Sequence, residues 1–235
     1  MGILSCVGDS FYIPSCAFTV KYPQLSKAIQ EYVRVRHGLS ITGCCVPTCT
    51  DGTPFSPGNS VYYICHNCAA IVEETHPEVE LRSVWELILS DESFPYPDYH
   101  GQSITVQDCW RTRDRTGEQD AVRALLKKMN FDVCELPQNR FETDFCGASL
   151  YRPTSKKNLE LAPHRFIENC TGKFIPHTEA EQRALMREYC KRFTIDKVVG
   201  YCKHCVEGLE WGGVDVKHVG SLLFEVNSWI NGRKD

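Results

Sequence analysis

The chain reads Cys44-Cys45-Val46-Pro47-Thr48-Cys49 and, further on, Cys65-His66-Asn67-Cys68. An adjacent pair of cysteines is thus followed by a Cys-x-x-Cys motif. Adjacent side chains tend to diverge from a single point, so the pair is poorly suited to one metal ion. Neighbouring thiolates can instead reach different metal atoms of a polynuclear cluster, and thiolates are the ligands that hold iron–sulfur clusters. This stretch therefore indicates an iron–sulfur site.

A second group of cysteines repeats the arrangement later in the chain. It consists of Cys109, Cys146 and the motif Cys202-Lys203-His204-Cys205. Beyond each Cys-x-x-Cys motif lies a similar block, Val79-Glu80-Leu81-Arg82-Ser83-Val84 in one case and Val214-Asp215-Val216-Lys217-His218-Val219 in the other. The chemical type is kept at every position except Ser83 against His218. An internal repeat of this kind predicts two halves of similar architecture.

Hydrophobic periodicity predicts an alternation of strands and helices in each half. Strands are expected near 11–13, 61–64, 79–81, 104–106, 131–136, 197–201 and 214–216, and helices near 22–36, 68–74, 84–89, 118–130, 179–193, 202–211 and from 220 onward. Residues 39–60 are expected to be a loop, 91–102 a linker, and 157–170 partly helical. Alternating elements imply right-handed crossovers and a mostly parallel sheet.

The expected fold is therefore α/β, with two pseudo-repeated halves covering residues 1–100 and 101–235. Each half is a small, mostly parallel sheet with flanking helices. Four cysteines, Cys16, Cys65, Cys109 and Cys202, directly follow predicted strands. Because sites in such sheets form at the carboxyl ends of the strands, the cysteine clusters are expected there.

The composition favours a globular protein of the reducing cytoplasm. The chain has 235 residues, a net charge of −4 and fourteen cysteines. It has no basic excess, so nucleic-acid binding is not expected. The first residues lack the pattern of a signal peptide, and no segment is apolar over the length of a membrane span. In a cytoplasmic protein, abundant cysteine indicates metal or redox chemistry more than structural disulfides.

At these cysteines the sequence resembles the cysteine-rich CCG domain family. That family includes the CCG-domain subunit of heterodisulfide reductase and iron–sulfur subunits of several dehydrogenases. Its motif is a lone Cys, a Cys-Cys-Gly and a Cys-x-x-Cys, usually present twice, and five such cysteines can hold a noncubane [4Fe-4S] cluster. The resemblance spans the chain from Cys16 to Cys205 and implies a CCG-type cluster-binding site in each half.

The resemblance implies a set of ligands in each half. The first set is Cys16, Cys44, Cys45, Cys65 and Cys68, and the second set is Cys109, Cys146, Cys202 and Cys205. Val46 stands where the family has glycine, whereas Gly147 follows Cys146. Phe145 takes the place of the first cysteine of the second pair, so the second set has four thiolates. The implied cofactors are a noncubane [4Fe-4S] cluster in the first half and a second [4Fe-4S] cluster, for which four thiolates suffice, in the other.

Several other residues could contribute to the chemistry. His66 and His204 lie inside the two Cys-x-x-Cys loops and are the candidate catalytic residues, since imidazole can protonate a leaving thiolate near neutral pH. Arg111, Arg113 and Arg115 could hold an anionic substrate or stabilise a reduced cluster, or form a solvated face. Cys134 and Cys190 are expected in the core, and Cys49 is a reserve ligand. Cys6 and Cys170 have no assigned role.

The resemblance implies an oxidoreductase, or part of one. Such a protein takes electrons from a flavin or ferredoxin-like iron–sulfur partner and reduces a small disulfide or related acceptor. Two alternatives remain open: an electron-transfer component of a larger dehydrogenase without substrate chemistry, and a zinc-stabilised interaction module built on the two Cys-x-x-Cys pairs. The sequence shows no nucleotide-binding or ferredoxin motif, so an electron-donating partner is expected.

Overall fold

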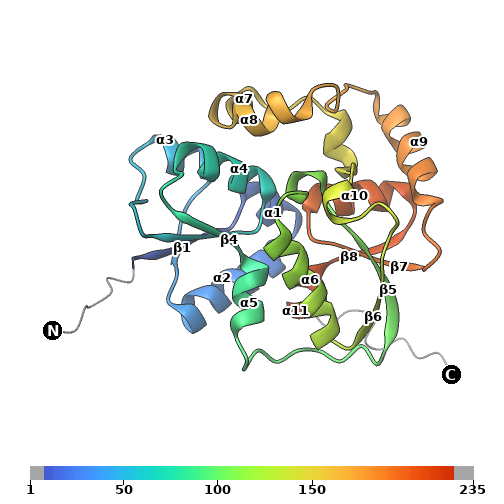
Figure 1. Ribbon diagram of the computed structural model, residues 1–235, viewed down its shortest axis with the longest axis horizontal. Coiled ribbons are helices and arrows are strands. Elements are labelled where there is room, and N and C mark those ends of the chain that lie inside the picture. The colour runs from blue at the N-terminus through green and yellow to red at the C-terminus, as the bar shows by residue number, and fades with distance from the viewer. Residues whose placement is uncertain (1–7, 225–235) are drawn as a thin grey trace.

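The computed structural model describes residues 8–224, and the expectations about the amino terminus, including Cys6, lie outside this range. It contains two four-stranded sheets, each entirely parallel, with helices packed around them (Figure 1). The strand orders are β2-β1-β3-β4 and β6-β5-β7-β8. The expected α/β fold with two pseudo-repeated halves is confirmed.

The first sheet and its helices occupy the left side of Figure 1. The elements are β1 (Ser10–Ile13), α1 (Cys16–Lys21), α2 (Pro23–His37), β2 (Ser40–Ile41), α3 (Cys45–Thr50), β3 (Ser60–Tyr63), α4 (His66–Thr75), β4 (Glu80–Ser83) and α5 (Val84–Ser90). The central strands are short and mostly buried, which suits their content of valine, isoleucine and aromatic residues.

The second sheet lies on the right side of Figure 1. The strands are β5 (Gln102–Gln107), β6 (Phe131–Cys134), β7 (Lys197–Gly200) and β8 (Asp215–His218). The α-helices are α6 (Thr116–Lys128), α7 (Lys156–Leu161), α8 (Pro163–Phe166), α9 (Glu179–Cys190), α10 (Lys203–Gly212) and α11 (Val219–Phe224), and the 3₁₀ helices are η1 (Trp110–Thr112), η2 (Arg140–Glu142), η3 (Gly147–Tyr151) and η4 (Glu168–Cys170).

The expectation for residues 39–60 was wrong in part. The segment contains β2, a two-residue strand paired with β1, and helix α3, which begins at Cys45. Glycine, proline, serine and threonine dominate this segment, and they favour turns when only the local sequence is considered. Pairing with β1 and packing of α3 against α4 override that preference.

The two halves pack by reciprocal contacts. Helix α5, which follows the last strand of the first sheet, packs against α6, the helix before β6. In the same way α11, which follows the last strand of the second sheet, packs against α2, the helix before β2. These matched contacts and the identical strand orders relate the halves by an approximate twofold repeat.

The largest hydrophobic cluster draws side chains from both halves. It includes Ile29, Trp85 and Ile88 of the first half, and Leu125 and Leu222 of the second. Tyr99 also joins the halves, since its hydroxyl donates a hydrogen bond to the carbonyl of Leu222 at 2.9 Å. The largest part of the core therefore lies where the halves meet, and two smaller clusters of the described residues lie apart from it.

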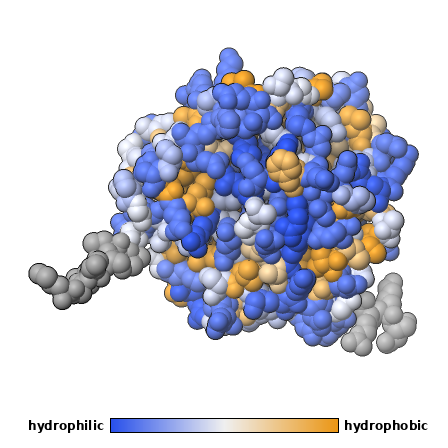
Figure 2. Space-filling model, in the orientation of Figure 1, coloured by the Kyte–Doolittle hydropathy of each residue, from blue (hydrophilic) through white to orange (hydrophobic). Residues whose placement is uncertain are grey.

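The surface is largely hydrophilic, with apolar side chains in scattered patches on the face that Figure 2 shows. None of the helices within residues 8–224 is both long and apolar enough to cross a membrane.

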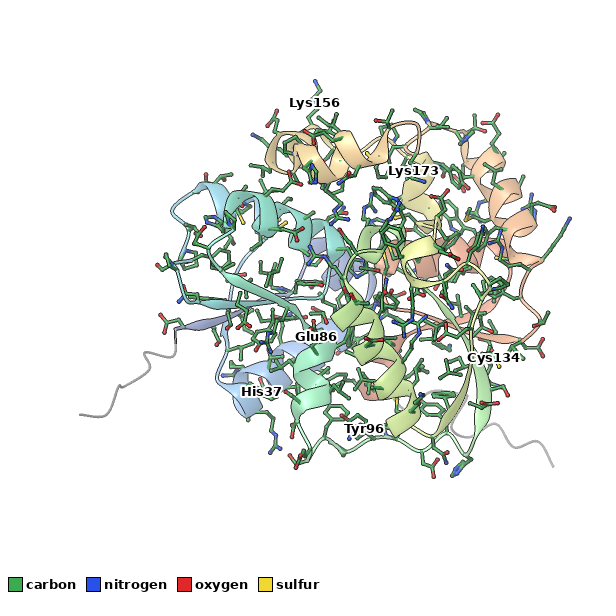
Figure 3. The ribbon with its side chains drawn as sticks, viewed as in Figure 1. His37, Glu86, Tyr96, Cys134, Lys156 and Lys173 are labelled. Carbon is green, nitrogen blue, oxygen red and sulfur yellow. The ribbon has the colours of Figure 1, made fainter. Side chains whose placement is uncertain are left out.

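The one chemical difference between the repeated blocks, Ser83 against His218, concerns the start of a helix. Ser83 begins α5 with a capping box: its hydroxyl accepts from the Glu86 backbone N–H, and the Glu86 carboxylate accepts from the Ser83 N–H at 2.8 Å (Figure 3 labels Glu86). At the start of α11, the Nδ1 of His218 accepts from the Gly220 N–H at 3.2 Å. The imidazole thus takes over the capping role of the serine hydroxyl.

Replacing His218 with asparagine is expected to make the protein less sensitive to acid. Burial lowers the pKa of His218 to about 3, despite the opposing effect of the Cys202 thiolate. In the unfolded chain the pKa is about 6.5, so above that pH both states are neutral and stability is unaffected. Below about pH 6.5 only the unfolded state takes up the proton. This uptake lowers the free energy of unfolding by about 2 kcal/mol at pH 5.

Asparagine keeps a capping acceptor but does not titrate. Urea unfolding of both proteins between pH 7 and pH 5 checks this expectation. The wild-type midpoint should fall more steeply than that of His218→Asn, and parallel losses would contradict the assignment.

Candidate functional site

The strand ends bring the two cysteine motifs to corresponding places. Cys65 is the residue before α4, and Cys202 is the residue before α10. Cys16 and Cys109 follow β1 and β5, the central strands that pair with β3 and β7. All four expected positions after strands are confirmed. Parallel pairing places these strand ends along one edge of each sheet, as the sequence predicted.

The structure brings together the five cysteines of the first set. The Sγ atoms of Cys16 and Cys44 are 3.8 Å apart. The thiol of Cys45 interacts with that of Cys44 on one side and with that of Cys68 on the other, and Cys68 also interacts with Cys65. Cys16 is exposed and Cys68 is buried, so the set extends from the surface into the protein.

The four cysteines of the second set are also close together, and all four are buried. The Sγ atoms of Cys109 and Cys146 are 3.8 Å apart. The thiols of Cys109, Cys146 and Cys205 lie within 4.8 Å of one another, and the thiol of Cys202 lies within the same distance of Cys109. Such a group of thiols could hold a metal ion.

Phe145, which takes the place of the first cysteine of the second pair, is a packed aromatic residue. Phe145 is buried and stacks on Tyr189, with ring centroids 4.2 Å apart. The following Gly147 has φ +52°, and a Cβ there would lie 2.0 Å from the carbonyl oxygen of His204. Glycine is therefore required after Cys146, whereas Val46 lies within α3 and meets no such restriction.

Hydrogen bonds between neighbouring thiols lower the pKa of some cysteines in each set. A hydrogen bond with Cys68 lowers the pKa of Cys65 well below its usual value, and one with Cys109 does the same for Cys202. Burial opposes ionisation of Cys146, but hydrogen bonds with Cys109 and Cys205 and the charge of Arg111 lower its pKa. Interacting thiols of this kind favour thiolates, the form that binds metals.

Arg111 is a buried cation aimed at the second set. Its side chain donates hydrogen bonds to the Sγ of Cys146 at 3.0 Å and to the Oγ of Ser149 at 2.7 Å. The rings of Phe166 and Phe174 lie 5.5 and 5.0 Å from the guanidinium. A buried guanidinium needs a compensating negative charge, so this arrangement is suited to an anionic group on the cysteines.

The other two arginines of the run have structural contacts. Arg115 donates a hydrogen bond to Glu73 at 2.7 Å, and its guanidinium lies over the ring of Tyr63. Arg113 lies over Phe141, with 4.5 Å between the guanidinium carbon and the ring centroid. Of the three, only Arg111 contacts a cysteine of the sets.

The two candidate histidines have different surroundings. His66 is buried at the start of α4, and its Nε2 lies 3.1 Å from an oxygen of Glu118. Although burial opposes it, the carboxylate of Glu118 and the thiol of Cys202 raise the pKa of His66 to about 10. His204 is partly exposed, with its Nδ1 3.7 Å from Glu207.

One pocket is lined by members of both cysteine sets, Cys65 and Cys202. The remaining lining residues are Ser15, Ala17, Phe18, Ile64, His66, Asn67, Arg111, Lys203 and His204. Arg111 and Lys203 bring positive charge to this pocket, whose volume is about 10 Å³. The two sets, which come from different halves of the chain, thus face a common space.

The thirteen cysteines within residues 8–224 are all free. Cys49 lies near Cys45, and burial raises the pKa of Cys49 to about 11. Cys190 is buried, as expected, whereas Cys134 is only partly buried at the outer margin of the second sheet (Figure 3). Cys134 falls on β6, an edge strand, which explains its greater exposure. Cys170 is buried and contacts the carbonyl of Phe166.

Sequence reasoning missed two polar residues near the thiols. Glu118 lies on the apolar face of α6, one turn before the buried Val122, and an acid in such a position is a usable signal for a buried pair. Ser15 has φ +61°, lines the pocket and lowers the pKa of Cys65 through a hydrogen bond. Its role depends on the turn after β1, and no local pattern reports it.

The donor groups suit a thiophilic metal. Soft thiolates are the ligands of zinc and of iron–sulfur clusters, and the buried Arg111 offers a positive charge beside the second set. The cysteine clusters could therefore hold metal ions. Comparison of the chain with protein-family models, with curated proteins and with solved structures found no match.

Proposed function

We propose that this chain is an iron–sulfur redox protein similar to the CCG-domain component of heterodisulfide reductase. It takes electrons from a partner and reduces a small disulfide or related acceptor. The observation that carries the proposal is the common pocket: Cys65 of the five-thiol set and Cys202 of the four-thiol set line the same space. The cavity measures about 10 Å³, so the proposal requires it to widen before a disulfide reaches both sets.

The cofactors of this proposal are a noncubane [4Fe-4S] cluster on the first cysteine set and a second [4Fe-4S] cluster on the second set. When bound, such clusters accept and release single electrons. Reduction of a disulfide consumes two electrons and two protons and yields two thiols. The electrons come from a flavin or ferredoxin-like iron–sulfur partner. The proposal includes a cytoplasmic location.

The surrounding side chains have roles that follow from their charges. Arg111 offers positive charge to the thiolates of the second set through its hydrogen bond to Cys146. Lys203 lines the pocket and can attract an anionic disulfide, although Glu207 at 3.0 Å offsets part of its charge. His66 and His204 remain the candidate proton donors to the departing thiolates.

The first test is the content of iron, sulfide and zinc in full-length protein purified without oxygen, with EPR spectra of the oxidised and reduced forms. About four to eight irons per chain are expected. Zinc without iron would overturn the redox proposal. It would favour a zinc-stabilised module, for which the four buried thiols of the second set are a suitable ligand group.

Serine at position 44 is expected to remove the first cluster. Cys44 joins Cys16 to Cys45, and a serine hydroxyl is a harder and more weakly binding ligand than a thiolate. The Cys44→Ser protein should contain about four fewer irons per chain and lack the EPR signal of the first cluster. Cys49→Ser is the matched control, because Cys49 lies near Cys45 on α3, the helix that begins directly after Cys44. Equal losses in both variants would contradict the ligand assignment.

Turnover separates a reductase from a pure electron-transfer protein. Protein reduced with dithionite and freed of excess reductant is mixed with 3,3′-dithiodipropionate, a small anionic disulfide. A reductase should release two thiols for every two electrons that it loses. Iron-loaded protein that leaves the disulfide intact would favour pure electron transfer.

A further inference from the structure

His66 belongs to the first half but reaches the second cysteine set. It is the first residue of α4, next to Cys65. A ring nitrogen of His66 and the thiols of Cys109 and Cys202 all lie within 4.8 Å of one another. The imidazole also packs edge-to-face on Tyr201, with ring centroids 5.6 Å apart. His66 therefore stands beside thiols of the other half.

The two ring nitrogens of His66 have different partners. Nε2 pairs with Oε1 of Glu118 at 3.1 Å, and Oε2 of Glu118 accepts a hydrogen bond from the Tyr63 hydroxyl at 2.8 Å. Nδ1 is buried and has no partner of good hydrogen-bond geometry within the described residues 8–224, although the imidazole interacts with the thiol of Cys202. A histidine that binds a metal usually donates its second ring N–H to a carboxylate, which leaves the first nitrogen free to bind. His66 has this arrangement.

The pair of a histidine with a buried acid occurs at only one of the two equivalent places in the repeat. The residue of α10 that corresponds to His66 is Lys203, which pairs with Glu207 at 3.0 Å. The third residue of α6 is Glu118, whereas the third residue of α2 is the buried Leu25. A buried acid is costly unless it is paired. The pair formed by His66 and Glu118 is thus an addition to the common architecture, placed beside the set that lacks a fifth cysteine.

We propose that His66 is a ligand of the metal centre in the second half, together with Cys109 and Cys202. Glu118 is the positioning residue that holds the imidazole through Nε2, and Nδ1 is the ligating atom. The second centre then has five protein ligands, four thiolates and one imidazole, and one of them comes from the other half. This inference rests on the proposed function only in requiring a metal centre on the second set, and it replaces the proton-donor role of His66, which leaves His204 as the candidate donor.

The test compares full-length proteins that contain ¹⁴N- or ¹⁵N-histidine, purified without oxygen. Pulsed EPR of the paramagnetic cluster state measures the coupling between electron spin and histidine nitrogen. Direct ligation predicts a strong coupling that changes with the isotope. A histidine that only donates a hydrogen bond to Cys202 would give a weak coupling, which would overturn the proposal. This measurement on the wild-type protein does not depend on the folding of any variant.

Two variants assign the signal. His66→Gln should abolish the strong nitrogen coupling, and His204→Gln, which alters the histidine of the other Cys-x-x-Cys loop, should preserve it. A coupling that survives in His66→Gln would overturn the proposal. Glu118→Gln keeps the imidazole but removes its carboxylate partner, so the coupling should persist with a changed magnitude.

A cobalt experiment tests ligation by His66 even if the proposed iron–sulfur function is wrong. If the protein contains no iron, Co²⁺ is added to the metal-free full chain and its visible absorption is recorded. Ligation by His66 predicts that His66→Gln shifts the cobalt bands while His204→Gln leaves them unchanged. Identical spectra for wild type and His66→Gln, or no cobalt binding to the second set, would overturn the inference.

Discussion

Alanine at position 147 is expected to disrupt the second cysteine set and leave the first set intact. Gly147 has φ +52°, a conformation that costs alanine about 1–2 kcal/mol. An added Cβ would also lie 2.0 Å from the His204 carbonyl oxygen and 2.7 Å from the Cys205 Cα. Backbone atoms of α10 would have to move, at a further cost of roughly 1–3 kcal/mol. Such a movement separates Cys146 from Cys205.

The measurement is the metal content of Gly147→Ala and its unfolding in urea. Gly101→Ala is the matched control, because Gly101 has φ +72° but no atom within 4 Å of the position of a Cβ. The control should lose only about 1–2 kcal/mol and keep its metal. If Gly147→Ala were as stable as the control and bound as much metal, the close approach of η3 and α10 would not matter to the site.

Methionine at position 123 is expected to destabilise the protein by about 3–5 kcal/mol, because it leaves a buried charge without its partner. The Arg123 guanidinium donates to both oxygens of Asp108, at 3.1 and 2.7 Å. The Asp108 side chain is 0% exposed and also accepts from the Tyr201 hydroxyl at 2.7 Å. Asp108 directly precedes Cys109, so its ion pair with Arg123 also fixes the end of β5.

Urea unfolding of Arg123→Met measures this loss, and the double variant Asp108→Asn/Arg123→Met provides the comparison. Removing the charge of Asp108 as well should recover part of the stability, because asparagine is less costly to bury without a cation. A loss below about 1 kcal/mol in the single variant, the value typical of exposed pairs, would contradict a buried ion pair.

Much of the fold can be predicted from local sequence. The run Val61-Tyr62-Tyr63 and the run Lys197-Val198-Val199 both indicate strands, and both are strands that end just before a Cys-x-x-Cys motif. The helix near 118–130 was expected from its apolar spacing, and α6 covers 116–128. These elements bury one consistent face, so their pattern is visible without knowledge of the rest of the chain.

The parts that sequence reasoning missed depend on tertiary contacts. Strand β2 has two residues and exists only through its pairing with β1. Arg111 resembles part of a solvated basic run, yet it is 3% exposed beside Cys146. His66 was expected to be a proton donor to a leaving thiolate, and the structure pairs it with Glu118 of the other half. The first two outcomes have no local signal, and for His66 the only signal is the acid on the apolar face of α6, because each outcome depends on which segments meet.

The hydrophobic cluster shared by the two halves has a consequence for cooperativity and for the history of the molecule. Trp85 and Leu222 belong to one core, so neither half can keep its apolar face covered without the other. Separating the halves between α5 and β5 would expose that apolar face on both fragments. The intact protein should therefore unfold in a single transition. If the repeat arose by duplication of an ancestral unit, two copies of that unit could have covered the same apolar face, because the contacts between the halves are reciprocal.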